Sequence, residues 1–173
     1  MRIFEKKSKA AFTLIELLVV IAIIGILAGM LLAGIGAVRK MVRRVKGYSE
    51  CEQLESGLEQ YYLEYKTWPL SDAGDIVLDS TKPLLQILQG TNYIDGAIQR
   101  NPKKFEFMKF TKFDTAGDPV SPWNTKYYVR FDQDFDNMIT AAGGSEPQTD
   151  VRKRVIVWTL NADKNENIGS WER

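Results

Sequence analysis

An apolar run near the N-terminus constrains this chain more than any other feature. From Phe12 to Val38 the only charged residue is Glu16. A helix of this length can cross the roughly 30 Å hydrocarbon core of a bilayer. A carboxylate inside such a helix costs up to about 3 kcal/mol at the bilayer centre, so it is expected to have a function. The sequence therefore predicts a membrane-spanning helix with Glu16 as a functional acid.

The residues that flank this run indicate its orientation. Basic residues in the first eleven positions favour a cytoplasmic N-terminus and place the rest of the chain on the far side of the membrane. A secretory signal peptide also begins with basic residues, but its hydrophobic core is shorter than a run that continues to Val38. Five further basic residues follow the run and are predicted to contact lipid phosphates: Arg39, Lys40, Arg43, Arg44 and Lys46.

The first 29 residues combine a short basic leader, a Phe after a small residue, and a Glu four positions later. This combination resembles the cleavage and methylation motif of type IV prepilins. The resemblance implies that a prepilin peptidase removes Met1 to Ala11, cutting between Ala11 and Phe12, and that Phe12 is N-methylated. It also implies assembly into a helical fibre drawn from the inner membrane. The family usually has Gly before the cut, whereas this chain has Ala11.

Cleavage before Phe12 would provide a partner for Glu16. An α-amino group with a pKa near 8 is largely protonated at neutral pH. The amine of the same chain lies about 6 Å of helix rise below Glu16, but the amine of a neighbouring subunit is the better candidate, because that pairing requires subunits stacked in register. The alternative is a simple signal anchor in which Glu16 snorkels to the headgroups.

Beyond the membrane the helix is predicted to continue to about residue 66, where Trp68-Pro69 ends it. Apolar residues at steps of three and four form one stripe of this helix: Val45, Tyr48, Cys51, Leu54, Leu58, Tyr61, Tyr62 and Tyr65. The single Cys51 forms no internal disulfide, and because it lies among apolar neighbours of this helix we expect it to be a small packing residue and not a reactive thiol.

The remaining residues predict a short helix and a small sheet. Residues 83–90 indicate a short helix that Gly90 caps. Three segments are typical of strands: 105–107 at the start of an aromatic stretch to Phe113, 126–131, and 154–160. The elements are typical of an α+β fold, and the resemblance to type IV prepilins implies a pilin-like one with a long helix on a small antiparallel sheet. The chain then divides into a leader (1–11), a membrane-spanning and fibre-core helix (12–38) and a globular domain (39–173).

Several segments of the C-terminal half resemble the pseudopilin branch of this family, in particular the major pseudopilin of type II secretion. They are Leu58, Tyr61, Trp68-Pro69, the tract 121–127 and the ending from Trp158 to Trp171. The resemblance implies a subunit of a homo-oligomeric fibre that is anchored once in the bacterial inner membrane, with its C-terminal domain in the periplasm. It implies as partners minor pseudopilins, the prepilin peptidase and an inner-membrane assembly platform. A type IV pilin of a surface fibre for adhesion, motility or DNA uptake remains the alternative.

The same resemblance implies a calcium site in the C-terminal loop, formed by Leu160, Asp163, Asn165 and Asn167. Calcium takes six to eight oxygen ligands in a flexible loop, and neutral Asn167 contributes no charge. A plain polar turn is the alternative. Residues 132–137 begin like an EF-hand loop but lack the Gly and Glu that such a loop requires, so an acidic loop is expected there.

Composition excludes other classes of function. The chain has no His, which rules out imidazole catalysis and His-based zinc sites. After residue 46 it carries 14 basic and 20 acidic residues, so nucleic-acid binding by the globular part is not expected. The sequence predicts a structural protein and not an enzyme, with no required cofactor; a membrane-tethered enzyme or binding domain is the alternative from another class.

Overall fold

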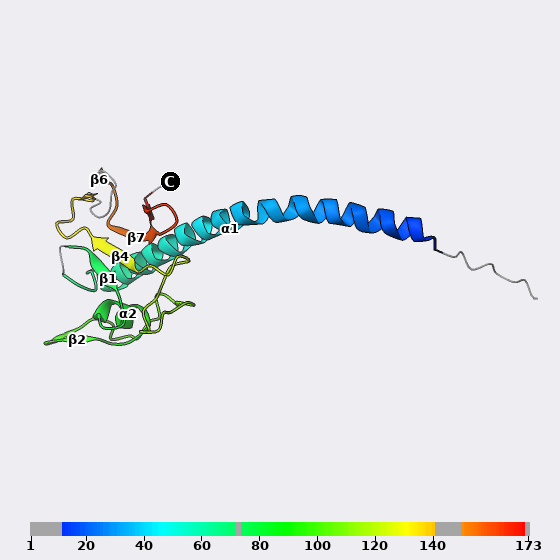
Figure 1. Ribbon diagram of the computed structural model, residues 1–173. Coiled ribbons are helices and arrows are strands. Elements are labelled where there is room, and N and C mark those ends of the chain that lie inside the picture. The colour runs from blue at the N-terminus through cyan, green and yellow to red at the C-terminus, as the bar shows by residue number, and fades with distance from the viewer. Residues whose placement is uncertain (1–11, 72–73, 141–149, 172–173) are drawn as a thin grey trace, which may run out of the picture. The chain divides into compact units, whose positions relative to one another are not determined.

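One long helix, α1 (Leu14–Tyr65), dominates the chain, and the computed structural model describes residues 12–71, 74–140 and 150–171 (Figure 1). The helix begins after Thr13, and Lys66 leaves it with a positive φ of 56°, just before Trp68-Pro69. The predicted long helix is confirmed at both ends to within two residues. The chain divides into two compact units, one up to Met41 and one from Val42 onward.

The second unit contains an antiparallel sheet of four strands in the order β1-β4-β7-β8. These strands are β1 (Ile76–Leu78), β4 (Tyr127–Phe131), β7 (Val155–Asn161) and β8 (Glu166–Gly169). The predicted strands at 126–131 and 154–160 correspond to β4 and β7, which pair from Tyr127 opposite Thr159 to Phe131 opposite Val155. The α+β, pilin-like fold is confirmed.

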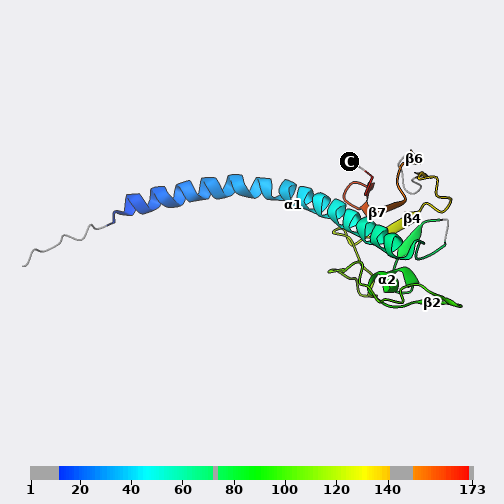
Figure 2. The ribbon, with the colours of Figure 1, turned by 180° about the vertical axis from the view of Figure 1, so that it is seen from behind.

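The core of this unit lies between the C-terminal part of α1 and the sheet, and both ribbon views show β4 and β7 beside this part of the helix (Figures 1 and 2). Cys51, Leu54 and Leu58 of α1 are fully buried. They pack in one cluster with strand residues that include Val129 and Val157. Burial of Cys51 confirms its predicted packing role.

The buried stripe of α1 differs from the predicted one at its start. Val45 is 59% exposed, so its inclusion in the stripe was wrong. Gly47 takes that place, because a Cβ there would lie 2.5 Å from the ring of Trp123. Gly57 likewise lets the carbonyl of Phe107 approach the helix, since a Cβ there would lie 2.7 Å from that oxygen. These two glycines lower helix propensity but permit close packing.

The aromatic stretch 105–113 forms no strand, which corrects the prediction from its composition. Its backbone N–H groups at Phe107 and Met108 instead donate to the carbonyl of Leu88 at the end of helix α2 (Pro83–Leu88). The Phe107 ring packs on Tyr61 and Tyr65 of α1, with centroids 5.3 and 6.2 Å apart. Its aromatic residues therefore cover the helix and do not enter the sheet.

Helix α2 confirms the predicted short helix, and Gly90 follows it with a φ of 86°. Two short ribbons complete the described fold. One joins β2 (Ile94–Asp95) to β3 (Ile98–Gln99), and the other joins β5 (Ile139–Thr140) to β6 (Asp150–Val151). The second ribbon lies within the connection from β4 to β7.

Candidate functional site

The start of α1 places Glu16 in a capping box with Thr13. The Thr13 backbone N–H and hydroxyl donate to Oε2 of Glu16 at 2.8 and 2.7 Å, and the Glu16 N–H donates to the Thr13 hydroxyl at 3.3 Å. Such a reciprocal pair satisfies backbone donors that a helix start otherwise leaves free. The Thr-x-x-Glu spacing was visible in the sequence, but only the structure shows its use here. Phe12 is described, whereas Ala11 lies outside the described residues.

The helix that follows presents an unburied apolar surface. Leu14–Leu31 is long and apolar enough to cross a membrane, with a mean hydropathy of 2.8, and none of it is buried in the described chain. Leu14 is 82% exposed and Met30 is 72% exposed. A surface of this kind requires lipid or other apolar helices around it, because contact of this much apolar area with water is unfavourable.

Three of the basic residues that follow this span lie close to acidic side chains of the same unit. Arg43 lies 3.9 Å from Asp163, and Arg44 lies 3.8 Å from Glu166, so both reach acids near the C-terminal end of the chain. Lys46 pairs with Glu50 on the same helix, at 3.7 Å. The predicted phosphate contacts are untested, and three of the five residues have acidic partners within their own unit.

The predicted calcium ligands lie in and around the turn between β7 and β8. Leu160 and Asn167 face each other across the β7–β8 ladder, while Asp163 and Asn165 lie in the turn. The Leu160 carbonyl accepts a hydrogen bond from the Thr125 hydroxyl at 2.7 Å. The Asp163 carboxylate accepts one from the indole N–H of Trp123 at 3.3 Å. Calcium binding by this set stays a prediction.

A second acidic group follows β4. The carboxylates of Asp132, Asp134 and Asp136 place oxygen atoms within 4.8 Å of one another. Asp132 is 2% exposed, and its two oxygens accept N–H donors from Phe135 and Asn137 at 2.8 and 2.9 Å. Burial raises the pKa of Asp132, and these two hydrogen bonds offset part of that rise because they stabilise the charged carboxylate. The observed hydrogen bonds fold the loop around Asp132, and the choice between a plain acidic loop and a metal site stays a prediction.

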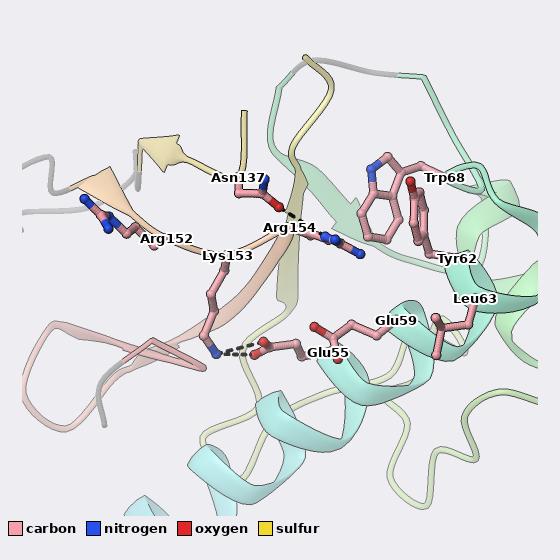
Figure 3. Close-up of a pocket in the computed structure, with 9 residues that line it drawn as sticks. All are labelled: Glu55, Glu59, Tyr62, Leu63, Trp68, Asn137, Arg152, Lys153 and Arg154. Carbon is pink, nitrogen blue, oxygen red and sulfur yellow. Dashed lines mark hydrogen bonds and ion pairs between the residues drawn. The ribbon is translucent and has the colours of Figure 1, made fainter. Parts of the chain in front are cut away.

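A pocket of about 390 Å³ opens between the C-terminal part of α1 and the segments that precede β5 and β7 (Figure 3). Lys153 reaches Glu55 of α1 in it, and Arg154 extends over the ring of Tyr62, 5.7 Å from its centroid. Lys153 and Arg154 thus both contact residues of α1, and these contacts join α1 to the segment that precedes β7. The residues that line the pocket are Glu55, Glu59, Tyr62, Leu63, Trp68, Asn137, Arg152, Lys153 and Arg154.

Comparisons with known proteins find matches to the N-terminal segment and to nearly the whole chain. The family model for the prokaryotic N-terminal methylation motif matches residues 6–32. A type II secretion system core protein G of Klebsiella pneumoniae is 33% identical over 164 residues, which cover 92% of each chain. The protein of that name from Klebsiella michiganensis is 34% identical over 99 residues, or 57% of this chain and 69% of that one.

The match to a third such protein, from Pectobacterium carotovorum, is 31% identical and covers 68% of this chain and 64% of the relative, less than two thirds of its length. No solved structure matches this chain. The methylation motif lies over the capped start of α1, and the longest of these alignments extends over nearly the whole sequence. The chain therefore belongs to the family of the type II secretion system core protein G, the major pseudopilin.

Proposed function

We propose that this chain is the main structural subunit of a periplasmic pseudopilus that drives protein secretion. In this proposal the prepilin peptidase cuts between Ala11 and Phe12 and methylates Phe12. The segment Leu14–Leu31 anchors the subunit once in the inner membrane before assembly, and the unit from Val42 onward lies in the periplasm. The role is mechanical and not enzymatic.

The observation that carries this proposal is the unburied apolar surface of Leu14–Leu31 behind a capped helix start. Lipid covers such a surface in the membrane, and apolar helices of neighbouring subunits can cover it in a fibre. Because the two environments are similarly apolar, a subunit can move from one to the other without exposing this surface to water. Polymerisation from the membrane is therefore compatible with the physical properties of this segment.

Glu16 gives the fibre its register in this proposal. The cap uses Oε2, and within the described residues no hydrogen bond reaches Oε1. The full negative charge remains when the cap forms, since Thr13 supplies only neutral donors. The protonated amine of Phe12 in a neighbouring subunit would compensate this charge in an apolar environment, where an unpaired ion is costly.

Growth of the fibre would push folded substrates through an outer-membrane secretin, with ATP consumed by a separate cytoplasmic motor. The partners in this proposal are further copies of the chain, minor pseudopilins, the prepilin peptidase and the inner-membrane assembly platform. In this proposal the apolar residues of the segment anchor it in the membrane, whereas Glu16 sets the register of the fibre. A substitution of Glu16 can therefore impair assembly without impairing membrane insertion.

The capping box between Thr13 and Glu16 allows the charge of Glu16 and its capping role to be tested separately. Glu16→Gln keeps an acceptor for Thr13 but removes the charge, because Gln serves as well as Glu in a capping box. Thr13→Ala removes the cap hydroxyl and keeps the charge. We expect Glu16→Gln to remain in the membrane and to reduce fibres and secretion at least tenfold, whereas Thr13→Ala retains most of both. The variants are compared in a strain of the native host that lacks the chromosomal gene.

Membrane fractions, chemically cross-linked periplasmic fibres, sheared surface fibres and culture-supernatant proteins are measured for each strain, with the wild-type gene as the control. Normal assembly of Glu16→Gln would refute the role of the charge. Loss of surface fibres with secretion intact in the deletion strain would make the chain a type IV pilin and overturn the proposed pseudopilus.

A further inference from the structure

Two arginines at the start of the second unit approach the C-terminal loop. Arg43 lies 3.9 Å from Asp163, and Arg44 lies 3.8 Å from Glu166. Arg44 also donates to the hydroxyl of Tyr48 at 3.3 Å, with its guanidinium 5.7 Å from the Tyr48 ring centroid. Neighbouring positions of α1 thus present two cations to two acids of the β7–β8 hairpin, Asp163 in its turn and Glu166 at the start of β8.

A buried tryptophan fixes the same turn from another direction. The indole N–H of Trp123 donates to Oδ2 of Asp163, the same oxygen that faces Arg43. Trp123 is 9% exposed, and its ring lies against Gly47, one turn along α1 from Arg43. Asp163 therefore faces one cation from α1 and accepts one hydrogen bond from a tract that itself packs on α1.

The charges around this turn disfavour a divalent cation. Arg43, Arg44 and Lys164 supply three positive charges near the two negative charges of Asp163 and Glu166. Calcium affinity rises with the number of negatively charged ligands. Among the four predicted ligands only Asp163 is charged, and a guanidinium already faces it. This donor set does not fit a calcium ion, because its charge is compensated from within the chain.

We propose that Arg43 and Arg44 do in this chain what a calcium ion would do in the C-terminal loop. They compensate Asp163 and Glu166 and hold the β7–β8 turn against α1, so the loop closes without a metal ion. The side chains of Arg43 and Asp163 are 53% and 35% exposed, and those of Arg44 and Glu166 are 44% and 26% exposed. Each pair is weak alone and screened by salt, so the two act together with the Trp123 bond.

Amide hydrogen exchange of the full-length protein in detergent tests this proposal. The N–H of Lys164 donates to the Asn161 carbonyl at 3.2 Å, and that of Asp163 to the Asn161 side chain at 3.1 Å, so both amides report opening of the turn. We expect Arg43→Gln with Arg44→Gln to speed their exchange about three- to tenfold, as loss of two exposed ion pairs implies. We expect millimolar calcium chloride, compared with a chelator, to leave wild-type exchange unchanged.

Arg39→Gln with Lys40→Gln is the matched control, because it removes the same charge from the preceding turn of the helix. This control is expected to leave exchange of the loop at the wild-type rate. Slower exchange of the wild-type loop in calcium would overturn the proposal. So would equal exchange rates in the Arg43/Arg44 variant and the wild type, or equal acceleration by the control variant.

Discussion

Asp118 is a single carboxylate that joins two segments of the globular unit. It is 5% exposed and accepts the N–H of Ser80 at 2.7 Å, while Lys126 lies 2.8 Å from its other oxygen. The Lys126 ammonium and the Ser80 donors lower the pKa of Asp118 to about 2. The charged form of this residue is therefore favoured in the folded protein.

This shift predicts an acid dependence of stability. A pKa of about 2 in the folded state lies below the ordinary Asp value of about 3.9, so the contribution of the Asp118 carboxylate to the stability of the fold is fully present above about pH 5. It is lost as the pH falls through about 4 to 2. We expect the melting temperature of Asp118→Asn to lie below that of the wild type at neutral pH and the difference to shrink across that range.

Thermal unfolding followed by circular dichroism across this pH range measures the difference. Asp95→Asn is the control, because Asp95 is an exposed carboxylate that pairs with Arg100 on the β2–β3 ribbon. A difference for Asp118→Asn that stays constant down to about pH 2 would contradict the prediction.

Among the elements, α1 and β7 are joined by a cation from the bend before β7. Lys153 donates to both oxygens of Glu55 at 2.7 and 2.8 Å (Figure 3). It also donates to the carbonyl of Ser170 at 2.7 Å. The side chain of Glu55 is 12% exposed. Its charge is thus largely removed from water and depends on Lys153 for compensation.

Removal of this cation is predicted to destabilise the globular unit. Lys153→Met should lower the free energy of unfolding by about 1–3 kcal/mol, because it leaves the Glu55 carboxylate partly buried without its partner. Lys103→Met, which removes the exposed partner of Glu64, should cost less than about 1 kcal/mol. Urea unfolding at neutral pH compares the two, and equal losses would show that the buried pair has no special role.

At the scale of the whole molecule, the apolar span and the globular core are separate along the sequence. The buried hydrophobic residues of the described chain begin at Cys51, whereas the apolar span ends at Leu31. The unit from Val42 onward therefore contains its own core, and the earlier residues contribute an exposed apolar surface. Stability of the domain and attachment to the membrane reside in different parts of the chain.

This separation predicts that residues 42–173 fold without the preceding segment. We expect this fragment to be soluble and monomeric and to melt within about 5 °C of the same unit in the full-length protein in detergent. Analytical ultracentrifugation and circular dichroism measure both properties. Residues 12–173 serve as the control and should require detergent. Aggregation of the shorter fragment would show that its core needs the N-terminal segment.

The sequence by itself determined the properties that depend on contiguous residues. The apolar span, its single acid Glu16 and the prepilin motif are legible without a fold, because each is defined by the residue types of one contiguous segment. The strand β7 was equally clear from its β-branched residues. The Thr13–Glu16 cap was also encoded locally, by its spacing.

Tertiary structure alone decided which distant residues meet. The aromatic residues from 105 to 113 are typical of a strand. The backbone of this stretch instead forms hydrogen bonds with the end of α2, and the ring of Phe107 packs on α1. Gly47, unfavourable in a helix, is explained only by the ring of Trp123 against it. The approach of Arg43 to Asp163 likewise depends on how β7 and β8 pack on α1, since no local pattern relates residues that far apart in the sequence.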